Sequence, residues 1–291
     1  MTRALTLGLI VSIGLLVGLA AGAGTPSYAG LSLPLWAALG SFGLQWLGFA
    51  FAYWRQTEAW FDLLGSLNYI ALVFLFLLLA PLAQERTLLV GCLVVVWAAR
   101  LGSFLFLRIR QAGGDSRFDA IRSRFGPFLM TWTLQALWVI ATAGCVLAAM
   151  AAADSPSLSL RDGVGLALWV IGFALEVTAD EQKHRFRRQP ENSGRFISTG
   201  LWSVCQHPNY LGEILLWSGL ALLALPALVG AQWLTLLSPV FVALLLLRIS
   251  GVPLLQKAAL KRWGADEQWR NYVTSTPVLL PWIGRRWKLD D

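Results

Sequence analysis

The sequence is poor in charge. Of its 291 residues only 13% are Asp, Glu, Lys or Arg, whereas 57% are hydrophobic. This balance excludes an ordinary soluble domain, in which about a quarter of the residues are charged. It is typical of a polytopic helical membrane protein, and the length suits one membrane domain over residues 1–291.

Metal ligands and nucleotide-binding loops are also scarce. The three cysteines, Cys92, Cys145 and Cys205, have no disulfide or metal spacing, and the chain has only two histidines, so we expect no metal. No Gly-x-Gly-x-x-Gly or P-loop follows a predicted strand, so any nucleotide must bind without a Rossmann or Walker fold.

Long apolar segments are abundant, and each is near the roughly 20 residues that cross a bilayer. The expected fold is an all-α polytopic transmembrane bundle of about eight helices, with seven to nine as the range. The first segment could be a cleaved signal peptide, but its length and the spans after it favour an uncleaved helix. The predicted spans are 4–23, 32–53, 61–83, 87–107, 127–150, 163–179, 209–229 and 233–250.

Basic residues lie mostly on one side of these spans. Only Arg86 and Arg161 fall in the opposite loops, and Arg100 and Arg248 fall inside spans. The positive-inside rule therefore predicts an integral membrane protein with both termini in the cytoplasm. Because topology explains most of the +7 net charge, we expect no nucleic-acid partner.

The stretch RFISTGLWSVCQHPNYLGEILLWSG carries the strongest functional signal. Pro208 suits the first position of a helix. Spacings of three and four residues make the polar side chains after it neighbours on that helix. Ionisable groups at the edge of a membrane helix are costly unless they pair or bind something. We therefore predict a site formed by His207, Asn209, Tyr210 and Glu213.

The preceding segment, DEQKHRFRRQPENSGRF, is predicted to be a basic loop. It carries Lys183, Arg187 and Arg195, and its Asp180 lies one turn after Glu176 on the same helix face. Guanidinium groups bind phosphate bidentately, so the segment could clamp a polyanionic cofactor. Alternatively, its charge serves only topology and contact with anionic lipid headgroups.

Polar residues also interrupt the apolar sequence of the N-terminal half. Asp62 and Tyr69 are seven residues apart, which places them on one helix face. An acid in a membrane helix is a functional candidate, and Arg100 is its expected partner. The alternative is a structural Asp–Arg pair. In the C-terminal tail, Tyr272 could cover the predicted site, or the tail could be a simple interfacial anchor.

The HPNYLGE motif and the ordered residues from Asp180 to Glu213 resemble the steroid 5-alpha-reductase superfamily, in particular its bacterial DUF1295-type membrane proteins. The resemblance covers roughly residues 160–285. It implies a bacterial inner-membrane protein with an NADPH side in residues 156–291 and a substrate side in residues 1–155. Glu176 departs from the Asn that steroid reductases have there. The cofactor residues implied or predicted are Glu176, Asp180, Lys183, Arg187, Arg195, His207, Asn209, Tyr210, Glu213 and Tyr272.

This resemblance implies hydride transfer from NADPH to a carbon–carbon double bond conjugated to the carbonyl of a lipid-like substrate. A hydrogen-bond donor must polarise that carbonyl as negative charge develops. Tyr69 and Asp62 are the expected counterparts of the family's donor residues, with Glu213 facing the nicotinamide. One alternative is an S-adenosylmethionine-dependent methyltransferase of the isoprenylcysteine or phospholipid type, which has a similar His-Pro-x-Tyr helix. A second is a non-catalytic membrane protein.

Overall fold

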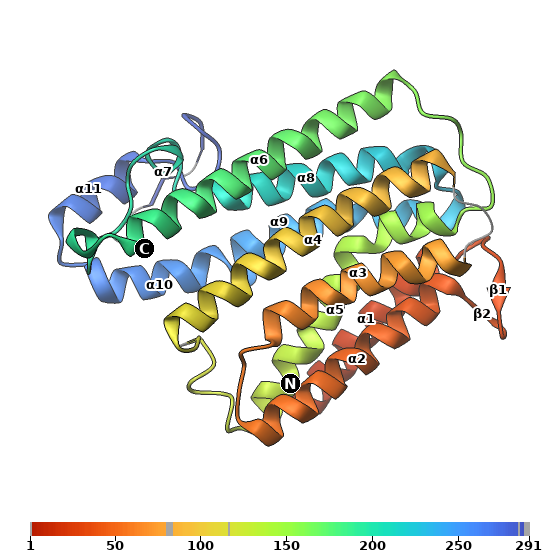
Figure 1. The fold of residues 1–291 in the computed structure, drawn as a ribbon, viewed down its shortest axis with the longest axis horizontal. Helices are drawn as coiled ribbons and strands as arrows, with labels where there is room; N and C mark the ends of the chain where they lie inside the picture. The colour runs from red at the N-terminus through yellow and green to blue at the C-terminus, as the bar shows by residue number, and fades with distance from the viewer. Residues whose placement is uncertain (1, 80–83, 116, 285, 288–291) are drawn as a thin grey trace. The chain divides into compact units, whose positions relative to one another are not determined.

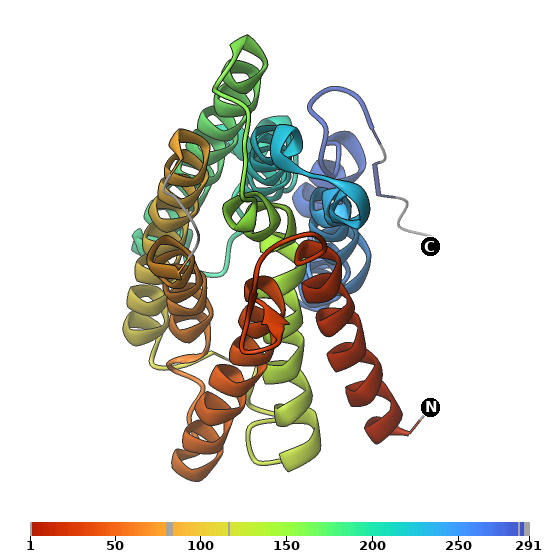
Figure 2. The ribbon, with the colours of Figure 1, turned by 90° about the vertical axis from the view of Figure 1, so that its right-hand side faces the viewer.

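The structure, a computed structural model, describes residues 2–79, 84–115, 117–284 and 286–287 (Figure 1). In this part of the chain, eight helical segments are long and apolar enough to cross a membrane. The strands of the described residues are β1 (Ser27–Tyr28) and β2 (Leu31–Ser32), which pair as a short antiparallel hairpin. Figure 2 shows this hairpin, in red, between the first two helices. The predicted all-α bundle of about eight helices is confirmed.

Two compact units divide the chain. Unit 1 comprises Met1–Asp162 and Leu220–Ser238, and unit 2 comprises Gly163–Gly219 and Pro239–Asp291. Each unit is described by itself below. The functional assignment of residues 1–155 to the substrate and 156–291 to the cofactor stays a prediction.

The helices of unit 1 follow the predicted spans closely. Each begins and ends within a few residues of its apolar run, because hydrophobic length is what a bilayer requires of a helix. The predicted end of the third span, residues 80–83, lies outside the described residues, as do both chain ends. The helices are α1 (Arg3–Ala21), α2 (Leu33–Arg55), α3 (Phe61–Leu79), α4 (Glu85–Ala112) and α5 (Phe125–Ala151).

Helix α5 is the centre of unit 1. It contacts α1, α2, α3 and α4, as well as η3 (Gly230–Leu237), a 3-10 helix of the same unit. All its residues from Val139 to Ala151 are buried. Their side chains are mostly small, which lets neighbouring helices approach closely in the absence of a strong hydrophobic drive within lipid.

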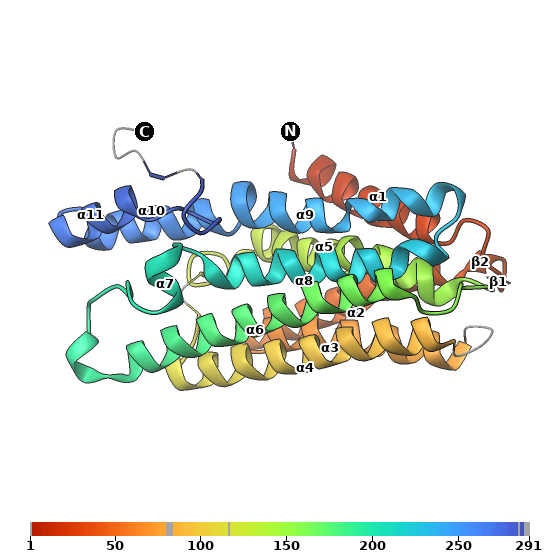
Figure 3. The same ribbon diagram turned by 90° about the horizontal axis from the view of Figure 1, so that it is seen from above.

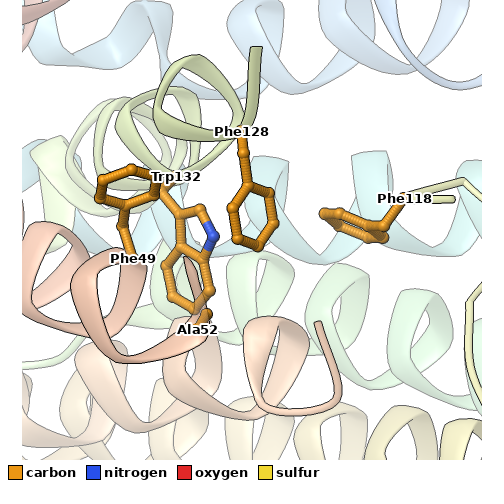
Figure 4. Packing of buried hydrophobic residues seen from close by; sticks show 5 residues of the cluster. All are labelled: Phe49, Ala52, Phe118, Phe128 and Trp132. Carbon is orange, nitrogen blue, oxygen red and sulfur yellow. The ribbon is translucent and has the colours of Figure 1, made fainter. Parts of the chain in front are cut away.

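An aromatic cluster packs the end of unit 1 where α5 begins (Figure 4). It consists of Phe49, Ala52, Phe118, Phe128 and Trp132. The Phe128 ring meets the rings of Trp132 and Phe118 edge-on, at centroid distances of 6.0 and 6.1 Å. Such pairs contribute about 0.5–1.5 kcal/mol beyond burial. Because Phe118 follows α4 in a connecting loop, the cluster anchors that loop to α2 and α5.

A buried arginine joins the start of α4 to residues 155–162 and to Leu223, all within unit 1. Arg86, near the start of α4, is only 2% exposed and forms an ion pair with Asp162. Its guanidinium also donates to the carbonyl of Leu223 over 2.6 Å. Further donations go to the connecting segment before Asp162, at Ser155 Oγ, Pro156 O and Ser157 O. The group is thus paired and well hydrogen-bonded, as a buried charge must be.

Unit 2 is built on two long helices, of which residues 160–162 and 220–224 are assigned to unit 1. These are α6 (Leu160–Arg188) and α8 (Pro208–Ala224), which run side by side in opposite directions (Figure 3). Shorter elements complete the unit: η1 (Pro190–Asn192), α7 (Leu201–Val204), α9 (Ser238–Leu244), the π-helical turn η4 (Leu245–Ile249), α10 (Val252–Trp263) and α11 (Glu267–Ser275). The short η2 (Leu225–Ala227) follows α8.

The structure corrects one boundary that matters for function. The basic segment from Asp180 to Arg188, predicted as a loop, is a continuation of α6. Polar side chains do not end a helix once it leaves the apolar layer, and the i,i+4 pair of Glu181 with Arg185 supports the extension. The helix ends just before Pro190, whose ring disfavours a helical conformation in the residue before it.

Candidate functional site

The candidate site depends on a direct backbone contact between α6 and α8. A Cβ atom added at Gly172 would lie 2.5 Å from the carbonyl oxygen of Gly212, and one added at Gly219 would lie 2.5 Å from that of Gly165. These distances leave no room for any side chain. We call the four residues Gly165, Gly172, Gly212 and Gly219 the glycine contact. Glycine is required at Gly172, Gly212 and Gly219 because two helix backbones touch.

The glycine contact determines which face of α6 points toward α8. Continuing along that face at helical spacing come Glu176, Asp180, Lys183 and Arg187. Glu176 is buried, Asp180 and Lys183 are half-buried, and Arg187 is exposed. The face therefore changes from acidic and buried to basic and exposed within three turns. All four are residues that the sequence predicted for the site.

At the start of α8, an amide and two carboxyl groups come together. Asn209 Nδ2 donates to Asp180 Oδ1 over 3.3 Å. Glu213, one turn further along α8, is half-buried and lies within the range of the Asp180 charge. Helix α8 begins at Pro208, as predicted from the motif. The structure thus brings together the predicted residues Asp180, Asn209 and Glu213.

Lys183 is held over an aromatic ring. Its Nζ lies 4.2 Å from the centre of the Trp202 ring, a cation–π contact. The Trp202 indole N–H donates to the carbonyl of Ala179 over 3.0 Å, and the Tyr272 hydroxyl donates to the carbonyl of Trp202 over 2.6 Å. Helices α6, α7 and α11 are therefore linked through one buried tryptophan. The sequence analysis did not single out Trp202, because Lys183 lies 19 residues earlier and only the fold brings the two together.

Two glutamines fix the segment that leads into α8. Gln182 accepts the backbone N–H of Leu201 over 2.9 Å. On the other side, the buried Gln206 amide donates to the carbonyls of Val273 and Thr276, at 3.0 and 2.7 Å. Residues 200–207 are thus held from α6 and from α11, so the start of α8 is a rigid platform rather than a free loop.

His207 and Tyr210 form a stacked pair on this platform. Their ring centroids are 5.2 Å apart and the planes are inclined by 13°. Burial, with a smaller contribution from the positive charge of Lys183, lowers the pKa of His207 to about 3. The imidazole is therefore neutral at physiological pH. It can donate and accept hydrogen bonds there, but it cannot serve as a cationic acid.

Tyr272 and Arg195 lie at the edge of the site. Besides its bond to Trp202, the Tyr272 ring packs 5.5 Å from that of Phe196, and burial raises the pKa of its phenol. Arg195 is exposed, in the loop between η1 and α7. That loop is tied to α10 by the Trp263 indole, which donates to the carbonyl of Gly194 over 2.5 Å. The basic side chain is free to meet a ligand from solvent while its backbone is anchored.

The other predicted catalytic residues belong to unit 1. Tyr69 is buried and its hydroxyl hydrogen-bonds to that of Thr142. Asp62 forms an ion pair with Arg117 over 3.4 Å, so the predicted partner Arg100 is wrong. Arg117 lies in the loop after α4, which sequence spacing could not place beside α3. The catalytic roles of Tyr69 and Asp62 stay predictions.

The same loop is fastened by a buried acid. Glu58, 3% exposed, accepts the backbone N–H of Asp115 over 2.9 Å and the Arg122 guanidinium over 3.2 Å.

Among the described residues, no group of three or more His, Cys, Asp or Glu side chains is arranged to hold a metal ion.

A family model described as "Protein of unknown function (DUF1295)" matches residues 48–276. The chain belongs to the DUF1295 family. This is the family of steroid 5-alpha-reductase-like proteins, so the resemblance inferred from the HPNYLGE motif is confirmed. The DUF1295 match includes every candidate site residue from Asp62 to Tyr272. No curated protein and no solved structure matches the chain significantly.

Proposed function

We propose that this DUF1295 protein is an integral-membrane, NADPH-dependent reductase. Its substrate would be a lipid-like molecule with a carbon–carbon double bond conjugated to a carbonyl group. The observation that carries the proposal is the face of α6 that points toward α8. There, a half-buried cluster of Asp180, Asn209 and Glu213 is followed within two turns by Lys183 and Arg187.

This order of groups fits a molecule with a polar, uncharged end and a polyanionic end. Lys183 and Arg187 would hold phosphate groups, and Arg195 would add a third cation from the neighbouring loop. Asn209 and His207 offer neutral hydrogen bonds close to the carboxylates, as a carboxamide would need. When bound, NADPH supplies a hydride to the substrate.

The acidic end would be the side at which the substrate is reduced. Glu213 is withdrawn from water on a membrane helix and near a second carboxylate, an arrangement that favours a functional role. Glu213 would orient the cofactor's reactive end. Tyr69, or Asp62 in its protonated form, is the predicted donor of a hydrogen bond to the substrate carbonyl, by the logic of charge stabilisation in the transition state.

A methyltransferase that uses S-adenosylmethionine is the second candidate. The stacked His207–Tyr210 pair is the observation that favours it, because this pair is the His-Pro-x-Tyr signature shared with those enzymes. S-adenosylmethionine lacks a polyphosphate, so it would leave Lys183, Arg187 and Arg195 without a ligand. The number of cations on one side of the site therefore favours NADPH.

Thermal unfolding of the detergent-purified protein distinguishes these functions. We expect NADPH to raise the melting temperature, since a ligand at ~100 times its dissociation constant adds roughly 2.7 kcal/mol to the native state. NADH and S-adenosylmethionine are compared at the same concentrations. Stabilisation by S-adenosylmethionine alone would support the methyltransferase and contradict the reductase.

Matched arginine variants test the phosphate clamp. In Arg187→Ala, about tenfold more NADPH or higher should be needed for the same shift in melting temperature, because a charge-assisted hydrogen bond contributes about 1.5–3 kcal/mol. Arg185→Ala is the control, since it removes the same charge from the other face of α6, where Arg185 pairs with Glu181. Equal NADPH responses in the two variants would remove Arg187 from the site.

A further inference from the structure

Two amide side chains in the interior of unit 1 lack hydrogen-bond partners. Gln45 on α2 is fully buried, and neither its Nε2 nor its Oε1 has a partner in the described part of the chain. Asn68 on α3 is 2% exposed, and its Nδ2 is likewise unpaired among those residues. Leaving such a group without a partner costs about 1–3 kcal/mol. Three unpaired amide atoms on two side chains therefore need an explanation.

The two side chains face the same region. Ser41 Oγ donates to Asn68 Oδ1 over 3.1 Å, which joins α2 and α3 at this level. Gln45 follows Ser41 by one helical turn, so both project from the same side of α2. Gln45 therefore lies on the side of α2 that carries Ser41, one turn along from the Ser41–Asn68 contact.

Another buried glutamine of unit 1 shows how such a side chain is normally satisfied. Gln232 is 1% exposed and Gln45 is 0% exposed. Its Nε2 donates to the carbonyl of Ala23 over 2.9 Å, and its Oε1 accepts the N–H of Val229 over 3.0 Å. The same unit thus pairs both ends of one glutamine and neither end of the other. Gln45 differs in its partners, not in its burial.

The unpaired atoms define the chemistry of the missing partner. Gln45 Nε2 and Asn68 Nδ2 each need an acceptor, whereas Gln45 Oε1 needs a donor. A hydroxyl group meets both needs, since its oxygen accepts two hydrogen bonds and its hydrogen donates one. A carbonyl would leave Gln45 Oε1 unpaired, and an ion would find no counter-charge on two neutral amides. If the Asn68 amide is flipped, two donors are needed, which a water molecule supplies and a single alcohol hydroxyl does not.

We propose that Gln45 and Asn68 form a buried binding site for a neutral hydroxyl, either that of a water molecule or that of a lipid-like alcohol. The site lies within α2 and α3 and is separate from the residues assigned to NADPH. It does not depend on the reductase function. Both sources would form the same hydrogen bonds, but only a lipid-like alcohol would add a detectable mass to the purified protein.

The test compares the thermal stability of Gln45→Met and Gln232→Met in the full-length protein. Methionine has nearly the length and flexibility of glutamine without its polar atoms. If Gln45 binds a hydroxyl, both variants should melt several degrees below the wild type, because each loses satisfied hydrogen bonds. If Gln45 has no partner, Gln45→Met should be as stable as the wild type or more stable, and the proposal would be overturned.

Two further measurements identify the ligand and guard against a variant that merely packs badly. Native mass spectrometry of the wild type reveals a lipid alcohol as an added mass that Gln45→Met loses; destabilisation without an added mass assigns the hydroxyl to water. The double variant Gln45→Met/Asn68→Ala should melt higher than the sum of the two single effects predicts, since both residues share one ligand. Additive losses would show that no common partner exists.

Discussion

At the scale of single residues, His207 is the side chain whose protonation the fold controls most clearly. It is 8% exposed and stacked on Tyr210, and burial keeps its imidazole neutral. A neutral ring at the start of α8 can bind a ligand group without competing with Lys183 for an anion. The site thus separates its cations, on α6 and its loop, from its neutral donors, on α8.

His207 also makes stability depend on pH in a defined direction. Its pKa is 6.5 when unfolded and about 3 in the folded protein, so between these values the unfolded chain binds more protons. The free energy of unfolding should therefore fall as the pH decreases below 6.5, by about 1.4 kcal/mol at pH 5.5. Chemical unfolding of the detergent-solubilised protein at pH 7.5 and pH 5.5 measures this loss.

The His207→Gln variant should lose that part of the pH dependence. His184→Gln is the matched comparison, because it removes the other histidine and keeps His207. If His207→Gln and the wild type lose the same stability between the two pH values, the histidine is not kept neutral by the fold.

At the scale of elements, the glycine contact sets the position of α6 against α8. The backbone atoms of Gly172 and Gly212 approach so closely that Asp180 and Asn209, two turns away along α6 and one along α8, come within hydrogen-bonding distance. The site is therefore a consequence of two helices touching without side chains between them. Polar residues of the right type would not suffice on helices held further apart.

Gly212→Ala tests this dependence. The new Cβ would lie 2.5 Å from the carbonyl oxygen of Gly172 and 2.6 Å from the amide nitrogen of Glu176, so the backbones must separate. We expect a loss of about 1–3 kcal/mol in stability and a smaller stabilisation by NADPH. Gly163→Ala on α6 is the control, since its Cβ meets nothing within 4 Å. That control should gain about 0.5 kcal/mol from helix propensity, and equal behaviour of the two variants would contradict the role of the contact.

The Arg86 network is a second feature at this scale, and it stabilises the start of α4. Arg86→Met would leave the buried Asp162 without its counter-charge, which costs about 3–5 kcal/mol. Adding Asp162→Asn should recover part of that loss, because the remaining side chain is neutral. Unfolding of the single and double variants in the same detergent measures both effects. A double variant less stable than Arg86→Met would show that the charge of Asp162 is not the cause.

At the scale of the whole molecule, the distribution of basic residues predicts which side of the membrane each loop occupies. Both chain ends should lie in the cytoplasm. A green fluorescent protein fused after the last residue should therefore fluoresce, and an alkaline phosphatase inserted after Asp154, between α5 and α6, should be active outside. The opposite pattern would reverse the orientation and place the candidate site on the outer side.

The sequence was sufficient for the spans but not for what lies beyond the apolar layer. Hydrophobic length predicted α1 to α5 to within a few residues, and the proline of the HPNYLGE motif predicted the start of α8. Hydropathy gave no signal for the last turns of α6, although Pro190 did mark their end. The prediction that Arg100 pairs with Asp62 was wrong. The actual partner, Arg117, lies in a loop that folds back onto α3, and residue spacing along one helix contains no information on that loop.

The Arg86 network also constrains the order in which the chain can assemble during synthesis. Arg86 leaves the ribosome with α4, but Asp162 and the carbonyl of Leu223 are made much later. Until residue 223 has been inserted, the guanidinium has only part of its hydrogen-bond partners and must remain near water or headgroups. Unit 1 therefore cannot close around α4 while translation is still in the first half of the chain. Its completion waits for a segment that follows the first part of unit 2, Gly163–Gly219, in sequence.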